Sequence, residues 1–159
     1  MRKGIVVLFI LAVAGGLMAQ TGGEVQSASV TLSAAQLQGL RENPVVLIPA
    51  PAPGKAINAQ SALLEYAAGS QRYAGGHSRF EITLGPYSSL SPVSVFDSVL
   101  TSGFTDQDAD QTVTREANPL DPSLNLENQD LEIVLFGPPL IDGDGAVTVT
   151  VNYTIVSLQ

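Results

Sequence analysis

The 159-residue chain contains no cysteine and no tryptophan, and it has a single histidine. Without cysteine it can form no disulfide bond, perform no thiolate chemistry and bind no zinc through sulfur ligands. A single imidazole also excludes a metal centre built from several histidines.

Charged residues are scarce as well, at 14% of the chain, and most of them are acidic. Seven lysines and arginines stand against fifteen aspartates and glutamates, for a net charge of -8. Proteins that bind nucleic acid neutralise phosphates with a basic surface, so this balance excludes nucleic acid as a partner. Hydrophobic residues make up 45% of the chain, too many for a disordered acidic chain and enough for one domain with a core.

The longest uncharged apolar run lies at the N-terminus, after the basic pair Arg2 and Lys3, and covers residues 4–19. A short positive segment, an apolar run and a small residue before polar ones are typical of a secretory signal peptide, with cleavage expected after Ala19. The alternative is an uncleaved membrane anchor, although this run is slightly shorter than the ~17–25 residues that span a bilayer. We therefore expect export to the periplasm, the cell surface or the medium, with membrane contact only through residues 4–19 if they are retained.

Much of the remaining chain alternates apolar and polar residues, which is the period of a half-buried strand. The clearest cases are residues 79–84 and 146–156. Further strands are expected at 28–32, 45–48, 56–68, 112–116 and 131–136.

Two segments favour short helices instead. Ser33 and Gln36 have the spacing of a capping box, which predicts a helix over 34–40. Residues 93–104 are ambiguous: Phe96, Val99 and Phe104 have helical spacing and favour a short helix, whereas other apolar positions in this segment suit a strand and a loop.

About seven short strands separated by turn residues predict an all-β fold, a single β-sandwich or jelly-roll-like domain with one or two short helices. In the expected layout, residues 1–19 form an apolar helix that precedes the domain and serves as a signal peptide or membrane anchor. A linker and first strand follow at 20–28, and the β-sandwich domain covers 29–159.

Asp106, Asp108 and Asp110 place three carboxylates at alternating positions, a spacing that calcium-binding loops use. The EF-hand is excluded because Gln111 and Ala117 stand where that motif requires glycine and glutamate. A looser calcium site at the three aspartates remains as a prediction, and a solvated acidic loop is the favoured alternative. No other cofactor is expected.

No residue pattern predicts catalysis. His77 is the only imidazole that a Ser-His-Asp triad could use, but it lies in a glycine-rich loop, and no Gly-x-Ser-x-Gly motif accompanies it. The fifteen acidic residues single out no pair for glycoside hydrolysis. The Asp-Gly repeat at 142–145 is interpreted as a tight turn rather than as a ligand set, because such pairs supply positive φ. The chain is therefore not expected to be an enzyme.

Three motifs occur one after another along the chain. They are Val30-Thr31-Leu32-Ser33-Ala34-Ala35-Gln36, then Ala52-Pro53-Gly54-Lys55, then a closing strand that starts at Gly143-Asp144-Gly145. Together they resemble small virion-associated proteins of tailed phages and prophages, and the resemblance spans about residues 30–155. It implies a capsid-like or decoration-like structural β-protein without catalytic residues. A capsid protein assembled in the cytoplasm has no use for a signal peptide, so either the module has been adapted for export or the particle contains a membrane.

The function expected from the sequence is thus an exported, non-enzymatic structural module, located outside the cell or in a virion. Its expected partners are copies of itself or other structural proteins. The alternative is a secreted or membrane-anchored binding domain, stabilised by calcium. The expected contact surfaces are the polar loops at 69–78 and 105–116.

Overall fold

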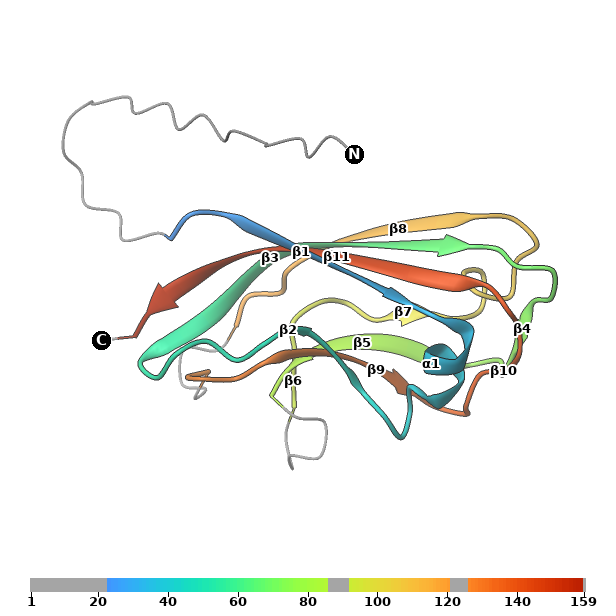
Figure 1. The fold of residues 1–159 in the computed structure, drawn as a ribbon, viewed down its shortest axis with the longest axis horizontal. Helices are drawn as coiled ribbons and strands as arrows, with labels where there is room; N and C mark the ends of the chain where they lie inside the picture. Colours follow the sequence, from blue (N-terminus) through green and yellow to red (C-terminus); the bar gives the residue numbers. More distant parts are fainter. Residues whose placement is uncertain (1–22, 86–91, 121–125, 159) are drawn as a thin grey trace, which may run out of the picture.

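The computed structural model describes residues 23–85, 92–120 and 126–158 (Figure 1). The predicted signal peptide, with its cleavage site after Ala19, lies outside these residues. In the part of the chain that is described, no helix has the length and hydropathy needed to cross a bilayer. Strands dominate the described residues, as the sequence predicts, and pair antiparallel in every sheet.

The first sheet has four strands in the order β1-β11-β3-β8. Their bounds are Gln26–Leu32 for β1, Ala146–Ser157 for β11, Lys55–Ala67 for β3 and Gln111–Glu116 for β8. The two long strands β3 and β11 form its centre, and their register shifts between Asn152 and Tyr153. This sheet confirms the four strands expected from the alternating pattern.

The second sheet has five strands, in the order β2-β9-β5-β6, with β7 also paired to β5. Their bounds are Val45–Ile48 for β2, Leu131–Phe136 for β9, Arg79–Leu84 for β5, Val93–Ser94 for β6 and Val99–Leu100 for β7. A further pair of two-residue strands, β4 (Tyr73–Ala74) and β10 (Ile141–Asp142), lies at one end of the molecule (Figure 1).

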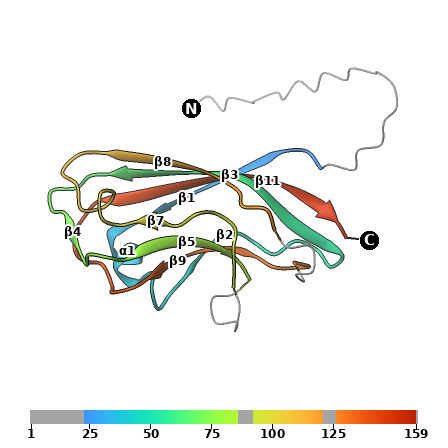
Figure 2. The ribbon, with the colours of Figure 1, turned by 180° about the vertical axis from the view of Figure 1, so that it is seen from behind.

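Several of the strand pairings are nested along the chain, whereas β5–β9 and β4–β10 cross them. The first strand pairs with the last, β2 with β9, β3 with β8, and β5 with the adjacent segments β6 and β7. The chain therefore passes repeatedly from one sheet to the other, and the two sheets form two layers (Figures 1 and 2).

Side chains from both sheets form one buried cluster. The first sheet contributes Leu64 and Val149, and the second contributes Phe80 and Ile133, each at most 1% exposed. Removing one such side chain from water stabilises the fold by about 1.5–3 kcal/mol. Because successive strand residues point to opposite faces, the polar residues between these positions lie on the outside of the layers.

Helix α1 (Ala34–Gly39) connects β1 to β2 and confirms the capping box. The Ser33 amide donates a 3.0 Å hydrogen bond to Gln36 Oε1, and the Gln36 amide donates one of 3.5 Å to Ser33 Oγ. The side chain of Leu37, a residue of this helix, is buried and packs α1 against the core.

The short helix favoured for residues 93–104 is wrong. The segment contains β6 and β7, and Phe96 forms an isolated bridge with Ala117. Phe96, Val99 and Phe104 are all buried, but Phe96 and Val99 lie in extended chain and only Phe104 lies in a turn, which follows β7. The first part of the segment forms backbone hydrogen bonds to β5 that are typical of an extended chain. For example, the Val95 amide donates to the Ile82 carbonyl at 2.9 Å.

Candidate functional site

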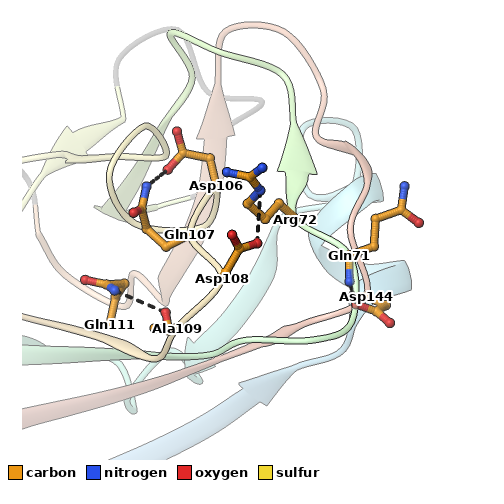
Figure 3. Close-up of polar contacts among 8 residues, drawn as sticks. All are labelled: Gln71, Arg72, Asp106, Gln107, Asp108, Ala109, Gln111 and Asp144. Carbon is orange, nitrogen blue, oxygen red and sulfur yellow. Dashed lines mark hydrogen bonds and ion pairs between the residues drawn. The ribbon is translucent and has the colours of Figure 1, made fainter.

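Of the two polar segments expected as contact surfaces, 69–78 lies beside the first part of 105–116, whose residues 111–116 form strand β8 rather than a loop (Figure 3). Arg72 Nε of the first loop lies 3.0 Å from Asp108 Oδ1 of the second, and the Tyr73 amide donates to the Thr105 carbonyl at 3.3 Å. The turn at 142–145 contacts the first loop through Asp144. We call residues 69–78, 105–111 and 142–145 the loop end.

Asp144 fastens two segments of the loop end to each other. Its Oδ2 accepts a 2.6 Å hydrogen bond from Ser70 Oγ, and its Oδ1 accepts one of 2.8 Å from the Gln71 amide. These hydrogen bonds, that of Ser70 first, lower the pKa of the Asp144 carboxyl. Gly69 is required beside it, because a Cβ there would lie 1.9 Å from Asp144 Oδ1. Asp144 therefore holds the turn in place, in agreement with the turn interpretation.

Asp106 forms two hydrogen bonds within its own loop. Its Oδ1 accepts a 2.7 Å hydrogen bond from the Gly103 amide and one of 2.5 Å from Gln107 Nε2. Gly103 has a φ of 81°, so the carboxylate stabilises a turn that favours glycine.

The other two aspartates of the predicted calcium loop contact different segments. Asp108 pairs with Arg72, whereas Asp110 Oδ1 accepts a 2.9 Å hydrogen bond from the Ala68 amide at the end of β3. Across the described ranges, no group of three or more histidine, aspartate or glutamate side chains is arranged to hold a metal ion. A calcium site at Asp106, Asp108 and Asp110 stays a prediction.

A cluster of aromatic rings lies at the base of the loop end. The Tyr66 ring lies 6.4 Å from that of Tyr73 and 6.0 Å from that of Phe104. Tyr73 is 3% exposed, and its hydroxyl donates a 2.6 Å hydrogen bond to the Gly145 carbonyl. Burial raises the pKa of Tyr73 to about 12, so the hydroxyl stays protonated and keeps this bond at neutral pH.

A small hollow of about 270 Å³ lies between the loops, lined by backbone, hydroxyl groups, one carboxylate and the apolar side chains of Ala74 and Leu140. Tyr73, Gly76, Ser102 and Asp106 are among its lining residues. His77 is exposed, as expected for a loop residue, and is not part of the lining. The hollow is slightly smaller than the ~300–1,000 Å³ of typical small-molecule sites.

The outer face of the first sheet carries rows of hydroxyl groups that the sequence analysis did not single out. Hydroxyl and amide side chains of neighbouring strands bond to one another there: Thr31 with Thr148 at 2.9 Å, Thr150 with Ser29 at 3.0 Å, and Asn152 with Ser61 at 3.1 Å. The alternation of serine and threonine in 27–31 and 148–152 is the signal that could have revealed this face.

No family model matches the chain, and no curated protein matches it. Among solved structures, a chain of the "Cyanophage Pam1 capsid asymmetric unit" is similar, with 14% sequence identity and a TM-score of 0.48. The match covers 90% of this chain and 93% of that chain.

Proposed function

We propose that this chain is a non-enzymatic structural module that assembles with copies of itself, in the manner of a phage coat or decoration protein. The observation that carries the proposal is the order of the strands. With β6 and β7 counted as one segment and the pair β4–β10 set aside, the main strands lie in the orders 1-8-3-6 and 2-7-4-5. These orders support a jelly roll, an architecture found in viral capsid and lectin domains.

Because a fold alone does not define a function, the loop end also bears on the proposal. The carboxylates of Asp108, Asp110 and Asp144 contact Arg72, the Ala68 amide and Ser70, respectively. Groups engaged in this way shape a fixed surface, which is what a structural contact requires. The motifs at Val30–Gln36 and 143–153, which resemble those of virion-associated proteins, point in the same direction.

We also propose that the chain is exported, with a signal peptide at 1–19, a linker and first strand at 20–28 and the β-sandwich domain at 29–159. This layout is tested by expressing the full chain, fractionating the cells and measuring the intact mass of the product. We expect a mature form that begins at Gln20 and lies outside the cytoplasm. A full-length chain in the membrane fraction would indicate the anchor instead, and a full-length chain in the cytoplasm would overturn export.

Assembly is tested by electron microscopy of the purified protein over a range of concentrations, with and without calcium. We expect regular rings, shells or sheets. A uniform field of single domains at every concentration would overturn the assembly proposal.

A second candidate, a secreted binding domain, is favoured by the hollow between the loops. Such a domain would bind a small polar ligand there, as lectins with the same architecture bind sugars. The test is a panel of soluble saccharides, scored by the shift in melting temperature of the wild type and of Ser102→Trp, which fills the hollow. A shift in the wild type that is lost in the variant supports binding, and no shift with any saccharide removes sugars as ligands.

A further inference from the structure

The edge strand β1 differs from the other edges of the two large sheets. Its seven residues, from Gln26 to Leu32, include no charged residue, no proline and no glycine. Proteins protect exposed sheet edges with charges, prolines or very short strands, because an open edge pairs readily with another chain. β1 has none of these protections along its length.

The other edges carry such features. β8 ends in Arg115 and Glu116, and the chain after it continues into the bridge between Ala117 and Phe96. β2 has four residues, and β6 and β7 have two each. Among the edge strands, β1 is therefore the longest one without a charged residue, and it is the edge best suited to pair with a strand of a second chain.

We propose that β1 of one copy pairs antiparallel with β1 of a second copy across a two-fold axis at Ser29. This pairing joins the two four-stranded sheets into one continuous sheet. The inference rests on the proposed self-assembly and identifies one of its contacts.

The sequence of β1 is self-complementary in this register, which pairs all seven residues. On the outer face, Ser27 lies opposite Thr31 of the second copy, and Ser29 lies opposite its own equivalent. These are the same kinds of hydroxyl pair that Ser29 and Thr31 already form with β11 in the structure. On the inner face, the apolar residues Ala28 and Val30 lie opposite each other, and Gln26 lies opposite Leu32 at each end of the ladder. Cross-strand pairs of both kinds stabilise antiparallel sheets.

Charge also favours this edge. The chain has a net charge of -8, so most pairs of surfaces on two copies repel each other. The acidic residues on the outer face of the first sheet, Glu65 and Glu116, lie on β3 and β8, two and three strands from β1. With strands spaced about 4.8 Å apart, they are roughly 10 Å or more from the proposed contact, beyond the ~8 Å screening length at physiological salt. Glu24 lies two residues before β1 and is outside the seven paired residues.

Introduced cysteines test the contact directly, because the chain has none of its own. Residues that face each other in antiparallel strands have Cα atoms about 4.5–5.5 Å apart, within the ~4.4–6.8 Å that a disulfide bridges. We expect the full chain carrying Ser29→Cys to form a disulfide-linked dimer under mild oxidation at least tenfold faster than Thr114→Cys. Thr114 is the matched control because it is exposed on the opposite edge strand β8.

Two further variants fix the register. Ser27→Cys alone and Thr31→Cys alone should cross-link slowly, whereas a mixture of the two should form a dimer containing one chain of each. Ser29→Lys places two like charges at the axis, so we expect it to weaken association at least tenfold while its thermal unfolding stays cooperative.

The solution mass of the wild type, measured in parallel, separates the possible failures. If the wild type assembles but Ser29→Cys cross-links no faster than Thr114→Cys, the β1 contact is wrong and self-assembly stands. If the wild type is a single chain at every concentration, self-assembly itself is wrong and the β1 contact fails with it. Faster cross-linking at Ser29, with the mixed dimer of the other two variants, supports the contact.

Discussion

Ser70 and Asp144 are 74 residues apart in the chain, and Ser70 Oγ donates a 2.6 Å hydrogen bond to Asp144 Oδ2. The bond joins the loop after β3 to the turn before β11. Since β3 and β11 are the central strands of the first sheet, this contact ties the loop end to the most extensive ladder of the fold.

Replacing Asp144 with asparagine should therefore lower the melting temperature by a few degrees at neutral pH. The amide cannot accept from both Ser70 and Gln71 as the carboxylate does. The pKa of Asp144 in the folded chain is below its ordinary value of 3.8, so its stabilisation is present above pH 4 and is lost as the pH falls further. The difference between wild type and variant should shrink below pH 4.

Thermal unfolding from neutral to acidic pH measures this effect, and Asp142→Asn is the matched control because Asp142 lies in the same turn. A difference that does not depend on pH, or an equal loss in the control, would contradict the assigned role of Asp144.

Tyr73→Phe removes the hydroxyl that bonds to the Gly145 carbonyl, and we expect a loss of about 1–2 kcal/mol in the free energy of unfolding. The pKa of Tyr73 is raised from 10.0 to about 12, so its contribution is complete below pH 10 and is lost between pH 10 and 12. Over that interval the wild type should lose more stability than the variant. Urea unfolding at several pH values measures the effect, with Tyr153→Phe on β11 as the control. Parallel pH profiles for wild type and Tyr73→Phe would show that the hydroxyl is not buried in this way.

Adjacent leucines on β3 test which face of the first sheet is covered. Leu64 is 1% exposed, and its replacement by alanine should cost about 2–5 kcal/mol because a cavity is left in the core. Leu63 is on the opposite face and half-buried, so Leu63→Ala should cost less than about 1 kcal/mol. The free energy of unfolding in urea measures both, and equal costs would contradict the assignment of the two faces.

Calcium should leave the melting temperature unchanged relative to magnesium at equal ionic strength. The reason is that Asp106, Asp108 and Asp110 each contact a different partner, and binding one ion would require these contacts to break. Melting curves of the wild type and of Asp110→Asn with either ion test this. A rise specific to calcium, lost in the variant, would instead support the calcium site predicted from the sequence.

Much of the fold could be predicted from the sequence because its long strands carry their own signal. In β5 and β11 every second side chain enters the core, and the capping box at Ser33 marks the start of α1. The two-residue strands β4 and β10 have no such signal, since pairing between distant segments creates them. The sequence of residues 93–104 misleads because Phe96 and Val99 reach the core from extended chain and Phe104 reaches it from the turn that follows, so buried side chains have helical spacing without a helix.

For the loop end, the sequence identified the polar loops but not their partners. The spacing of Asp106, Asp108 and Asp110 is compatible with a shared ion, yet the chain turns so that Asp108 meets Arg72 and Asp110 meets the end of β3. Asp144 was expected only to form a turn, because its contact with Ser70 depends on how distant segments pair.

Self-assembly is tested most directly by the mass of the purified protein in solution, measured by light scattering at increasing concentrations. We expect an integral multiple of the mass of one chain, which is 16.5 kDa at full length, with dissociation on dilution. The mass of a single chain at every concentration, with and without calcium, would contradict the proposed structural role.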